Sequence, residues 1–398
     1  MRRSRSILAA LGVLFLGGLA IAYPRAHRLY SVIHLFDRNR ITENFRDMKS
    51  MFAYRVVHKG DAVHEFKRSN RPLPDSFTFE GKQINLREFL ERTWTTGLVV
   101  IKDDTILHES YYRGNQASTQ CISWSVGKSF VSALVGLAVS EGRIKSIHDP
   151  ITDYLPELKK CGYDGVPIKD LLNMSSGIRF NEDYGDFHSD INRMGRTMAL
   201  GTSMTDFILT LKRERPSGQF RHYVSMDTQV LGMLVRATTA KSLSEGLEDH
   251  IWKKAGMESD AYWLLDSTGM ELAFGTLNVT LRDFARFGVL YRDQGRMMNQ
   301  QLVPAQWVHD SVTPDAPHLM PGKKSSSNSV FGYGYQWWIP PVPDGDFMAM
   351  GVYNQFIYVN PHRGIVIAKT SAHPNYNRDG DELESTAMFQ ALAREFEP

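Results

Sequence analysis

Strand-forming segments lie on either side of a long helical stretch in this chain. Residues 97–102 and 106–112 are rich in β-branched and aromatic residues, and Asp103-Asp104 separates them, which predicts a β-hairpin. Three more strands and a closing helix are predicted towards the C-terminus, at 347–350, 355–360, 365–371 and about 382–396. Because a sheet must bury its apolar face, we expect strands from both parts of the chain to meet in one antiparallel sheet.

The helical stretch covers roughly residues 140–340, where helical patches alternate with loops. A helix follows Ser125, in which apolar residues recur every three or four positions until Glu141-Gly142 ends the pattern. Farther on, Thr280 and Asp283 resemble a capping box at the start of another helix. We therefore predict an α/β fold: an antiparallel sheet flanked by helices, a mostly helical lobe, and a cleft between them.

Three regions are expected along the 398 residues. Residues 1–23 are predicted to form a signal anchor or a signal peptide. Residues 24–93 are predicted to form an N-terminal extension and linker, which ends near the breaker cluster Arg71–Asp75. Residues 94–398 are then long enough to form one large domain that contains the sheet and the helical lobe.

The first region has the pattern of a secretory signal. Arg2, Arg3 and Arg5 precede an uncharged stretch at residues 7–23. As a helix this stretch would extend roughly 26 Å, slightly less than a ~30 Å hydrocarbon core. Both retention as a membrane anchor and removal after export are compatible with the pattern. Either outcome places the main domain on the extracytoplasmic, periplasmic side, anchored in the inner membrane or secreted.

Composition excludes some classes of partner. The formal net charge is +2 and no basic run is interleaved with aromatic residues, so nucleic acid is not an expected partner. Cys121 and Cys161 form neither a disulfide framework nor a metal-binding pattern, and we expect two unpaired thiols. No metal or organic cofactor is expected. The oligomeric state does not follow from the sequence.

Ser125 and Lys128 carry the clearest chemical signal. A serine hydroxyl is a weak nucleophile until a base takes its proton. Residues three apart lie on one face of a helix, so Ser-x-x-Lys brings an amine next to the hydroxyl without any distant contact. This is the only place in the chain where a serine precedes a lysine by three. A serine at the start of a helix also faces free backbone N–H groups, which favour a developing oxyanion.

Tyr223, in the segment Tyr223-Val224-Ser225, is the candidate proton carrier. A phenol titrates near pH 10, and a nearby ammonium favours its ionised form. We expect Lys128 to supply that field, so that Tyr223 takes the proton of Ser125 and passes it to the leaving group. His222 is not favoured, because neighbours in a strand point to opposite faces and no Gly-x-Ser-x-Gly elbow is present.

Together with several further motifs, these residues resemble the serine β-lactamase and penicillin-recognising superfamily. The similarity is to its class C-like branch, which includes family VIII carboxylesterases and 6-aminohexanoate-oligomer hydrolases. It covers about residues 94–396 and rests on Ser125–Ser129, Asp149–Ile151, Tyr154–Pro156, Leu171–Gly177, Pro216–Gly218, Tyr223–Ser225, Gly332–Trp338 and Gly351–Gln355, in that order. The resemblance implies a β-lactamase/transpeptidase-like fold and a serine hydrolase that forms an acyl-enzyme.

The resemblance also implies roles for individual residues. Ser125 would be acylated, and Lys128 and Tyr223 would share the acid–base work. The backbone N–H groups of Ser125 and Val352 would form the oxyanion hole. The candidates for lining the substrate cleft are Ser225, Gly351, Tyr353 and Trp337.

One departure from the family pattern bears on the substrate. Penicillin-directed relatives carry Lys-Thr-Gly where this chain has Ala349-Met350-Gly351, so the cation that would hold a β-lactam carboxylate is missing. Lys369-Thr370-Ser371 falls on the following strand and does not replace it. We therefore expect a small ester or amide as substrate. The alternatives are a weak β-lactamase or D-amino-acid peptidase, or a catalytically silent, membrane-anchored binding or sensor module.

Overall fold

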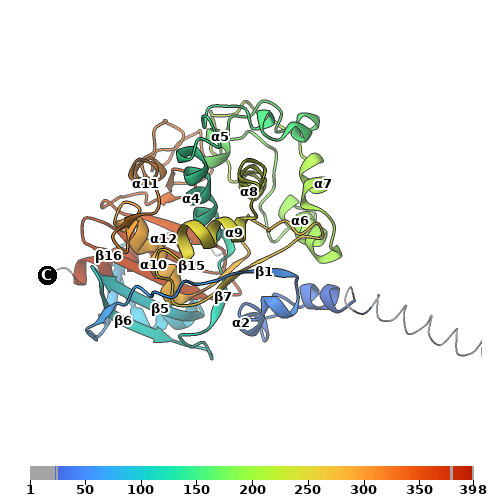
Figure 1. The fold of residues 1–398 in the computed structure, drawn as a ribbon. Coiled ribbons are helices and arrows are strands. Elements are labelled where there is room, and N and C mark those ends of the chain that lie inside the picture. The colour runs from blue at the N-terminus through green and yellow to red at the C-terminus, as the bar shows by residue number, and fades with distance from the viewer. Residues whose placement is uncertain (1–22, 24–25, 377–379, 397–398) are drawn as a thin grey trace, which may run out of the picture.

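The computed structural model describes residue 23, residues 26–376 and residues 380–396 (Figure 1). Its largest sheet has eight strands in the order β12-β13-β14-β15-β16-β5-β6-β2. Their bounds are β12 Gly332–Tyr333, β13 Trp338–Ile339, β14 Phe347–Gly351, β15 Gln355–Asn360, β16 Ile365–Ser371, β5 Thr95–Lys102, β6 Thr105–Tyr111 and β2 Lys67–Arg68. The predicted hairpin and the three late strands are therefore confirmed to within two residues.

The two parts of the chain meet where β16 pairs with β5. The pairing is antiparallel and runs from Ile365 opposite Lys102 to Lys369 opposite Leu98. This confirms the predicted sheet, with one addition at its edge, where the short β2 lies parallel to β6. The smaller sheets are β1 Tyr54–Val57, β8 Ala261–Leu264, β9 Leu277–Thr280 and β7 Gln120–Ile122, then β3 Ser76–Phe79 with β4 Lys82–Asn85, and β10 Arg296–Met297 with β11 Gln300–Gln301.

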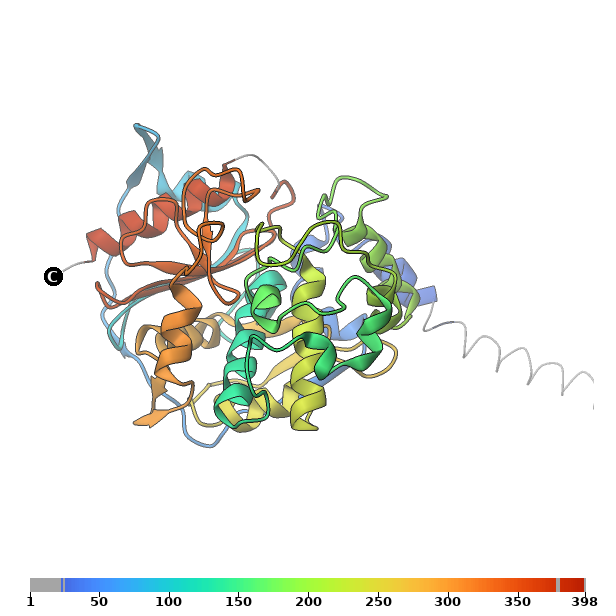
Figure 2. The same cartoon turned by 90° about the horizontal axis from the view of Figure 1, so that it is seen from above.

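Helices cover both faces of the large sheet. Alternate residues of β5 point to opposite sides: Leu98 and Val100 pack with α12 in one buried cluster, whereas Val99 and Ile101 belong to the main core. Figure 2 shows α12 (red) and α10 (orange) on opposite faces of the sheet. The longer helices are α3 Leu86–Arg92, α4 Gly127–Ser140, α6 Asp190–Leu200, α8 Ser225–Thr239, α10 Leu281–Arg292, α11 Ala305–Val312 and α12 Asp381–Glu395.

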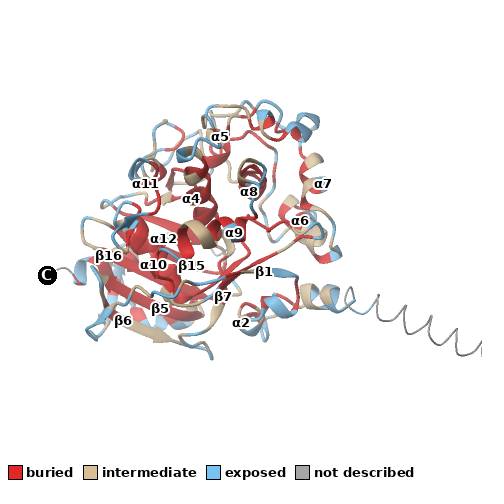
Figure 3. Cartoon of the chain, in the orientation of Figure 1, coloured by how far each residue is buried: buried red, intermediate tan, exposed pale blue. Residues whose placement is uncertain are grey.

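The helical lobe is built around α4 and α8, which are buried along most of their length (Figure 3). The shorter α-helices of the chain are α2 Ile41–Asn44, α5 Ile168–Leu172, α7 Met204–Leu209 and α9 Leu243–Leu247. The 3₁₀ or π turns are η1 Met48–Ser50, η2 Trp124–Val126, η3 Ile151–Asp153, η4 Pro156–Lys160 and η5 Glu248–Trp252. The predicted cap of α10 is confirmed, since the Thr280 side chain accepts a hydrogen bond from the Asp283 N–H.

The segment before residue 94 packs against the main body. Leu35, Ile41 and Phe45 are each at most 3% exposed and belong to the same hydrophobic core as α4. No helix in the described part of the chain is both long and apolar enough to cross a bilayer. Residues 1–22, which carry most of the predicted signal, lie outside the described residues. Both cysteines are unpaired, as expected.

Candidate active site

Ser125 lies in η2, the tight turn between β7 and α4. The turn begins with Trp124, whose positive φ of 44° is unusual for a residue other than glycine. The Ser123 N–H donates to Leu277 O at 2.7 Å and ties the turn to β9. Ser125 remains partly exposed, whereas Val126 and the first residues of α4 are buried. The turn therefore presents the serine side chain at the entrance of a buried helix.

Lys128, one helical turn after Ser125, is only 1% exposed. Its Nζ donates to Ser225 Oγ at 3.3 Å and to the carbonyl oxygen of Phe274. Burial lowers the pKa of Lys128 to about 7, although the negative charges of Glu182 and Asp227 act in the opposite direction. A substantial fraction of the amine is therefore neutral at neutral pH, as a general base requires.

Tyr223 also lies at this site, next to Ser125 and Lys128. Its side chain is hydrogen-bonded to that of Ser125. Its ring stacks on Trp338 with centroids 5.4 Å apart, and Lys128 Nζ lies 5.4 Å from the ring centroid. The structure thus brings together the three residues that the sequence nominated for catalysis.

Burial opposes the ionised form of Tyr223 that the sequence analysis expects. Burial raises the pKa of Tyr223 well above 10, and the phenol of Tyr333 and the carboxyl of Glu182 raise it further. The hydrogen bond with Ser125 opposes these effects only in part. The same burial favours the neutral amine of Lys128, so the ammonium field expected at Tyr223 is weakened. Tyr223 is therefore a neutral phenol, suited to donate a hydrogen bond or a proton.

Glu182 is a residue of this site that the sequence analysis missed. Its Oε1 accepts a hydrogen bond of 2.6 Å from the Ser225 N–H at the start of α8. Burial raises the pKa of Glu182, and the nearby amine of Lys128 lowers it. Glu182 lies in a loop with no recognisable motif, so only the tertiary contact with Lys128 and Ser225 reveals it.

Gly351 and Val352 adjoin the nucleophile from β14. A Cβ on Gly351 would lie 3.1 Å from Ser125 N and 2.8 Å from Ser123 O, so the two backbones are in close contact. Among the described residues, the N–H groups of Ser125 and Val352 donate to no protein acceptor. These two donors are therefore available to a bound group, as an oxyanion hole would require.

The residues expected to line the substrate cleft differ in their surroundings. Ser225 contacts Lys128, as described, and Tyr353 packs against Trp124 with ring centroids 5.4 Å apart. Trp337 does not line the cleft: it is fully buried and packs against Tyr291 and Phe347 in the core. Its neighbour Trp338 contacts Tyr223 instead, because successive residues here point in opposite directions.

His222 is held away from the reaction centre, as expected for the neighbour of Tyr223. Its Nε2 lies 2.7 Å from Phe180 O, and its Nδ1 lies 3.0 Å from Asn328 Nδ2. Lys369 also lies apart, on β16, where its Nζ donates to Ser371 Oγ at 2.6 Å. Neither residue contacts Ser125, Lys128 or Tyr223.

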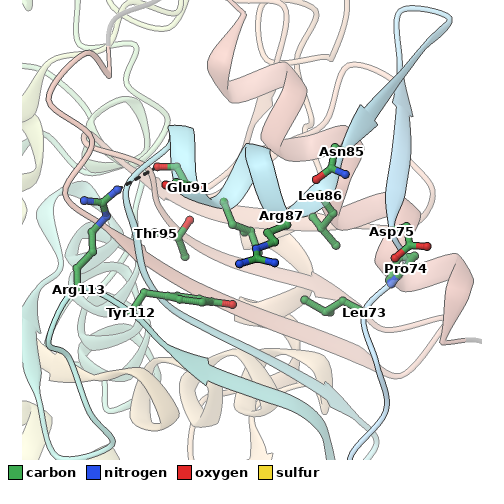
Figure 4. Close-up of a pocket in the computed structure, with 11 residues that line it drawn as sticks. Leu73, Pro74, Asp75, Asn85, Leu86, Arg87, Glu91, Thr95, Tyr112 and Arg113 are labelled. Carbon is green, nitrogen blue, oxygen red and sulfur yellow. Dashed lines mark hydrogen bonds between the residues drawn. The ribbon is translucent and has the colours of Figure 1, made fainter.

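A hollow of about 640 Å³ lies elsewhere on the molecule (Figure 4). It is lined from α3, β5 and the end of β6, for example by Leu86, Thr95 and Tyr112, and Arg113 at its rim donates to Glu91 O at 3.2 Å. None of the catalytic candidates lines it. It is therefore separate from the site around Ser125.

Comparison with known proteins agrees with this architecture. The family model described as Beta-lactamase matches residues 85–392. A 6-aminohexanoate-dimer hydrolase from Paenarthrobacter ureafaciens is 30% identical over 299 residues, which cover 73% of this chain and 76% of that protein. The family match thus includes every candidate residue of the site and leaves out the segment before residue 85.

Comparison with solved structures indicates the same fold. A Bacillus anthracis protein assigned as a 6-aminohexanoate-dimer hydrolase superposes with a TM-score of 0.82 at 25% identity, over 91% of this chain and 96% of that one. A D-stereospecific amidohydrolase from Streptomyces sp. superposes with a TM-score of 0.57 at 16% identity, over 78% of this chain and 98% of that one, and shares the fold.

Proposed function

Because the chain belongs to the beta-lactamase family, we propose that it is a serine hydrolase that cleaves a small amide or ester through an acyl-enzyme on Ser125. The observation that carries the proposal is the meeting of three groups: a partly exposed serine, its hydrogen-bonded tyrosine and a buried lysine with a lowered pKa. The homologues named as hydrolase and amidohydrolase support the reaction class.

In the proposed acylation step, the neutral amine of Lys128 takes the proton of Ser125, directly or through Tyr223. Ser125 Oγ attacks the substrate carbonyl, and the N–H groups of Ser125 and Val352 stabilise the negative oxygen. Tyr223 then donates its proton to the departing amine or alkoxide and regains one from the Lys128 ammonium. The carbon–nitrogen or carbon–oxygen bond breaks, which leaves the acyl group on Ser125.

Deacylation reverses these roles with water as the nucleophile. The leaving group has vacated its place, so a water molecule can lose its proton to the same amine–phenol pair and attack the ester carbon. Ser125 recovers its proton when the acid product leaves. The hydrogen bond from Lys128 to Phe274 O holds the amine in place throughout the cycle.

We propose a linear amide or ester without a β-lactam ring as the substrate class. Ala349-Met350-Gly351 offers no cation at the third family motif, where β14 faces η2. The 30% identical relative is named as a 6-aminohexanoate-dimer hydrolase, which makes short amides of amino acids with aliphatic chains the first substrates to try.

Fluorophosphonate labelling tests the nucleophile. We expect the probe to modify the wild type and not Ser125→Ala, with mass spectrometry placing the adduct on the peptide that contains Ser125. Ser132→Ala is the matched control, because Ser132 is a buried serine of α4, the helix that follows Ser125, and has no hydrogen-bond partner among the described residues. Labelling that persists in Ser125→Ala would refute the assignment, and rapid nitrocefin turnover would point to a β-lactamase instead.

We further propose that residues 7–23 carry the enzyme to the periplasmic side of the inner membrane. The described residues next to them support this, because Tyr30, Ile33 and Phe36 expose between 44% and 64% of their surface, as suits a segment near lipid. Carbonate extraction of membranes tests it. Retention in the pellet indicates an anchor, release into the periplasm indicates cleavage, and a cytosolic enzyme contradicts the proposal.

A further inference from the structure

Arg221 is a buried cation close to the proposed catalytic tyrosine. Its side chain is among the largest fully buried ones, at 1% exposure. Nε donates to Ser327 Oγ at 3.0 Å, and the guanidinium carbon lies 5.1 Å from the Trp338 ring and 5.5 Å from the Tyr333 ring. Trp338 also stacks on Tyr223, so one indole ring separates the guanidinium from the proposed acid.

The guanidinium of Arg221 has few directly bonded polar partners in the described part of the chain. No ion pair joins it to an acidic residue there, and no hydrogen bond involves its two terminal nitrogens. Glu382, at the start of α12, is the acidic residue that interacts with it electrostatically, but its side chain is exposed and forms no ion pair with the guanidinium. A buried charge without a partner is costly, so a site of this kind favours an anion.

The surroundings of Arg221 are basic. The positive charge of Arg221 helps to lower the pKa of both Lys324 and His318, and burial is the larger cause in each case. Burial lowers the pKa of Arg221 itself to about 10, so the guanidinium stays charged at neutral pH. Ser327, which accepts the bond from Arg221 Nε, also lines a hollow of about 490 Å³ together with Lys323, Lys324 and Asn328.

We propose that Arg221 binds a free carboxylate of the substrate, on the far side of Trp338 from the Ser125 hydroxyl. The site replaces, from a different element, the cation that Ala349-Met350-Gly351 lacks. A planar guanidinium that is stacked on rings keeps its two terminal nitrogens parallel, which suits a bidentate bond to a carboxylate. The inference rests on the proposed hydrolase function and narrows its substrates to amides and esters that carry a carboxylate.

Kinetics with matched substrates test the proposal. The linear dimer of 6-aminohexanoate and its C-terminal carboxamide contain the same scissile bond and differ only in the charge of one end. We expect wild-type kcat/KM to favour the carboxylate by about tenfold or more, as one or two charge-assisted hydrogen bonds provide. Arg221→Gln should bring the ratio close to one, and Arg221→Lys should give an intermediate ratio because an ammonium cannot bind both oxygens in a fork.

Arg215→Gln is the control, since Arg215 precedes Arg221 on the same segment but is paired with Glu214 at 2.7 Å, and the preference should persist in that variant. A purely structural role for Arg221 predicts a loss of thermal stability without a change in the substrate ratio. A wild-type ratio near one overturns the proposal whether or not the variants fold.

Binding without turnover separates this inference from the hydrolase assignment. Isothermal titration of 6-acetamidohexanoate into Ser125→Ala should show saturable binding that weakens about tenfold or more when Arg221→Gln is added. Equal binding by both proteins refutes the carboxylate site. If instead Ser125→Ala hydrolyses the dimer like the wild type, the acyl-enzyme proposal fails while the binding result still decides the role of Arg221.

Discussion

At the scale of single residues, burial decides which group of the site can act as a base. Lys128 and Tyr223 are both removed from water, and burial favours the uncharged form of each. For the Lys128 amine this means a lowered pKa and a free lone pair. For the Tyr223 phenol it means a raised pKa, so the phenol remains protonated. The proposed division of labour, with lysine as base and tyrosine as acid, rests on this one physical effect.

The first prediction concerns the pH dependence of kcat/KM. Lys128 must be neutral to accept a proton, and its pKa is about 7. Activity should therefore fall tenfold per pH unit below about 7 and level off above it. Initial rates between pH 5 and 9 with a neutral ester substrate measure the profile. A rate that is constant down to pH 5 would show that this amine is not the base.

A second prediction uses Glu182 to shift that profile. Its carboxylate raises the pKa of Lys128, so Glu182→Gln should move the acidic limb to lower pH while the amide oxygen still accepts from the Ser225 N–H. Asp183→Asn, one residue along in the same loop, is the control for a nonspecific charge effect. An unchanged limb in Glu182→Gln would show that the two groups are not electrostatically linked in solution.

At the scale of elements, close backbone contact shapes the site. The start of α4 and the end of β14 touch at Gly351, where any side chain would meet Ser123 O and Ser125 N. Glu182 caps α8 from a distant loop, so the helix that follows Tyr223 begins inside the site. Three elements therefore end or begin at the same point, which allows backbone N–H groups to take part in the chemistry.

Gly351→Ala tests this contact. The new methyl would lie 2.8 Å from Ser123 O, so β14 must move away from η2 and the two proposed oxyanion donors must separate. Loss of one such donor typically costs about 10²–10³ in kcat. Steady-state kinetics together with thermal melting should show a large fall in kcat and a small change in Tm. Gly195→Ala, in α6, serves as the control, because a Cβ on Gly195 would meet no atom within 4 Å and should leave kcat unchanged.

At the scale of the whole molecule, the N-terminal segment completes the wall beside the nucleophile. Phe45 is 3% exposed, and its ring lies 5.2 Å from that of Trp124 and 5.0 Å from that of Tyr353. The Ile122 N–H donates to Phe45 O at 3.0 Å, just before η2. Residues far outside the family match thus hold the turn that presents Ser125.

Phe45→Ala should accordingly destabilise the fold and the site together. Removal of a buried phenylalanine costs about 3–5 kcal/mol, and the loss of support should lower kcat as well. Urea unfolding and ester kinetics give the two readings. Phe187→Ala is the control, because Phe187 is 66% exposed and its removal should change neither reading.

A last prediction concerns stability against pH. Burial lowers the pKa of Lys369 to about 7, although Asp381 opposes the shift. In the unfolded chain a lysine titrates near 10.4, so between about pH 7 and 10 the unfolded state binds more protons and the free energy of unfolding rises with pH. Lys369→Met should flatten this rise in urea titrations at several pH values, and an unchanged slope would contradict the assignment.

The sequence by itself determined the local features, because period and spacing act over a few residues. The hairpin of β5 and β6, the helix after Ser125, the cap at Thr280 and the order of the last strands all follow from such patterns. The Ser-x-x-Lys spacing likewise needs only one helical turn. Even the meeting of β16 with β5 was predictable, because a sheet must cover its apolar face.

Only the tertiary structure decided the chemical state of these groups. Residues such as Phe274, which are far from Lys128 in the sequence, bury the amine of Lys128. The burial that keeps Tyr223 protonated likewise comes from distant residues. The position of Trp338 rather than Trp337 beside Tyr223, and the surroundings of Arg221, also depend on long-range packing. Solvation and charge are properties of the assembled surroundings, and no local pattern contains them.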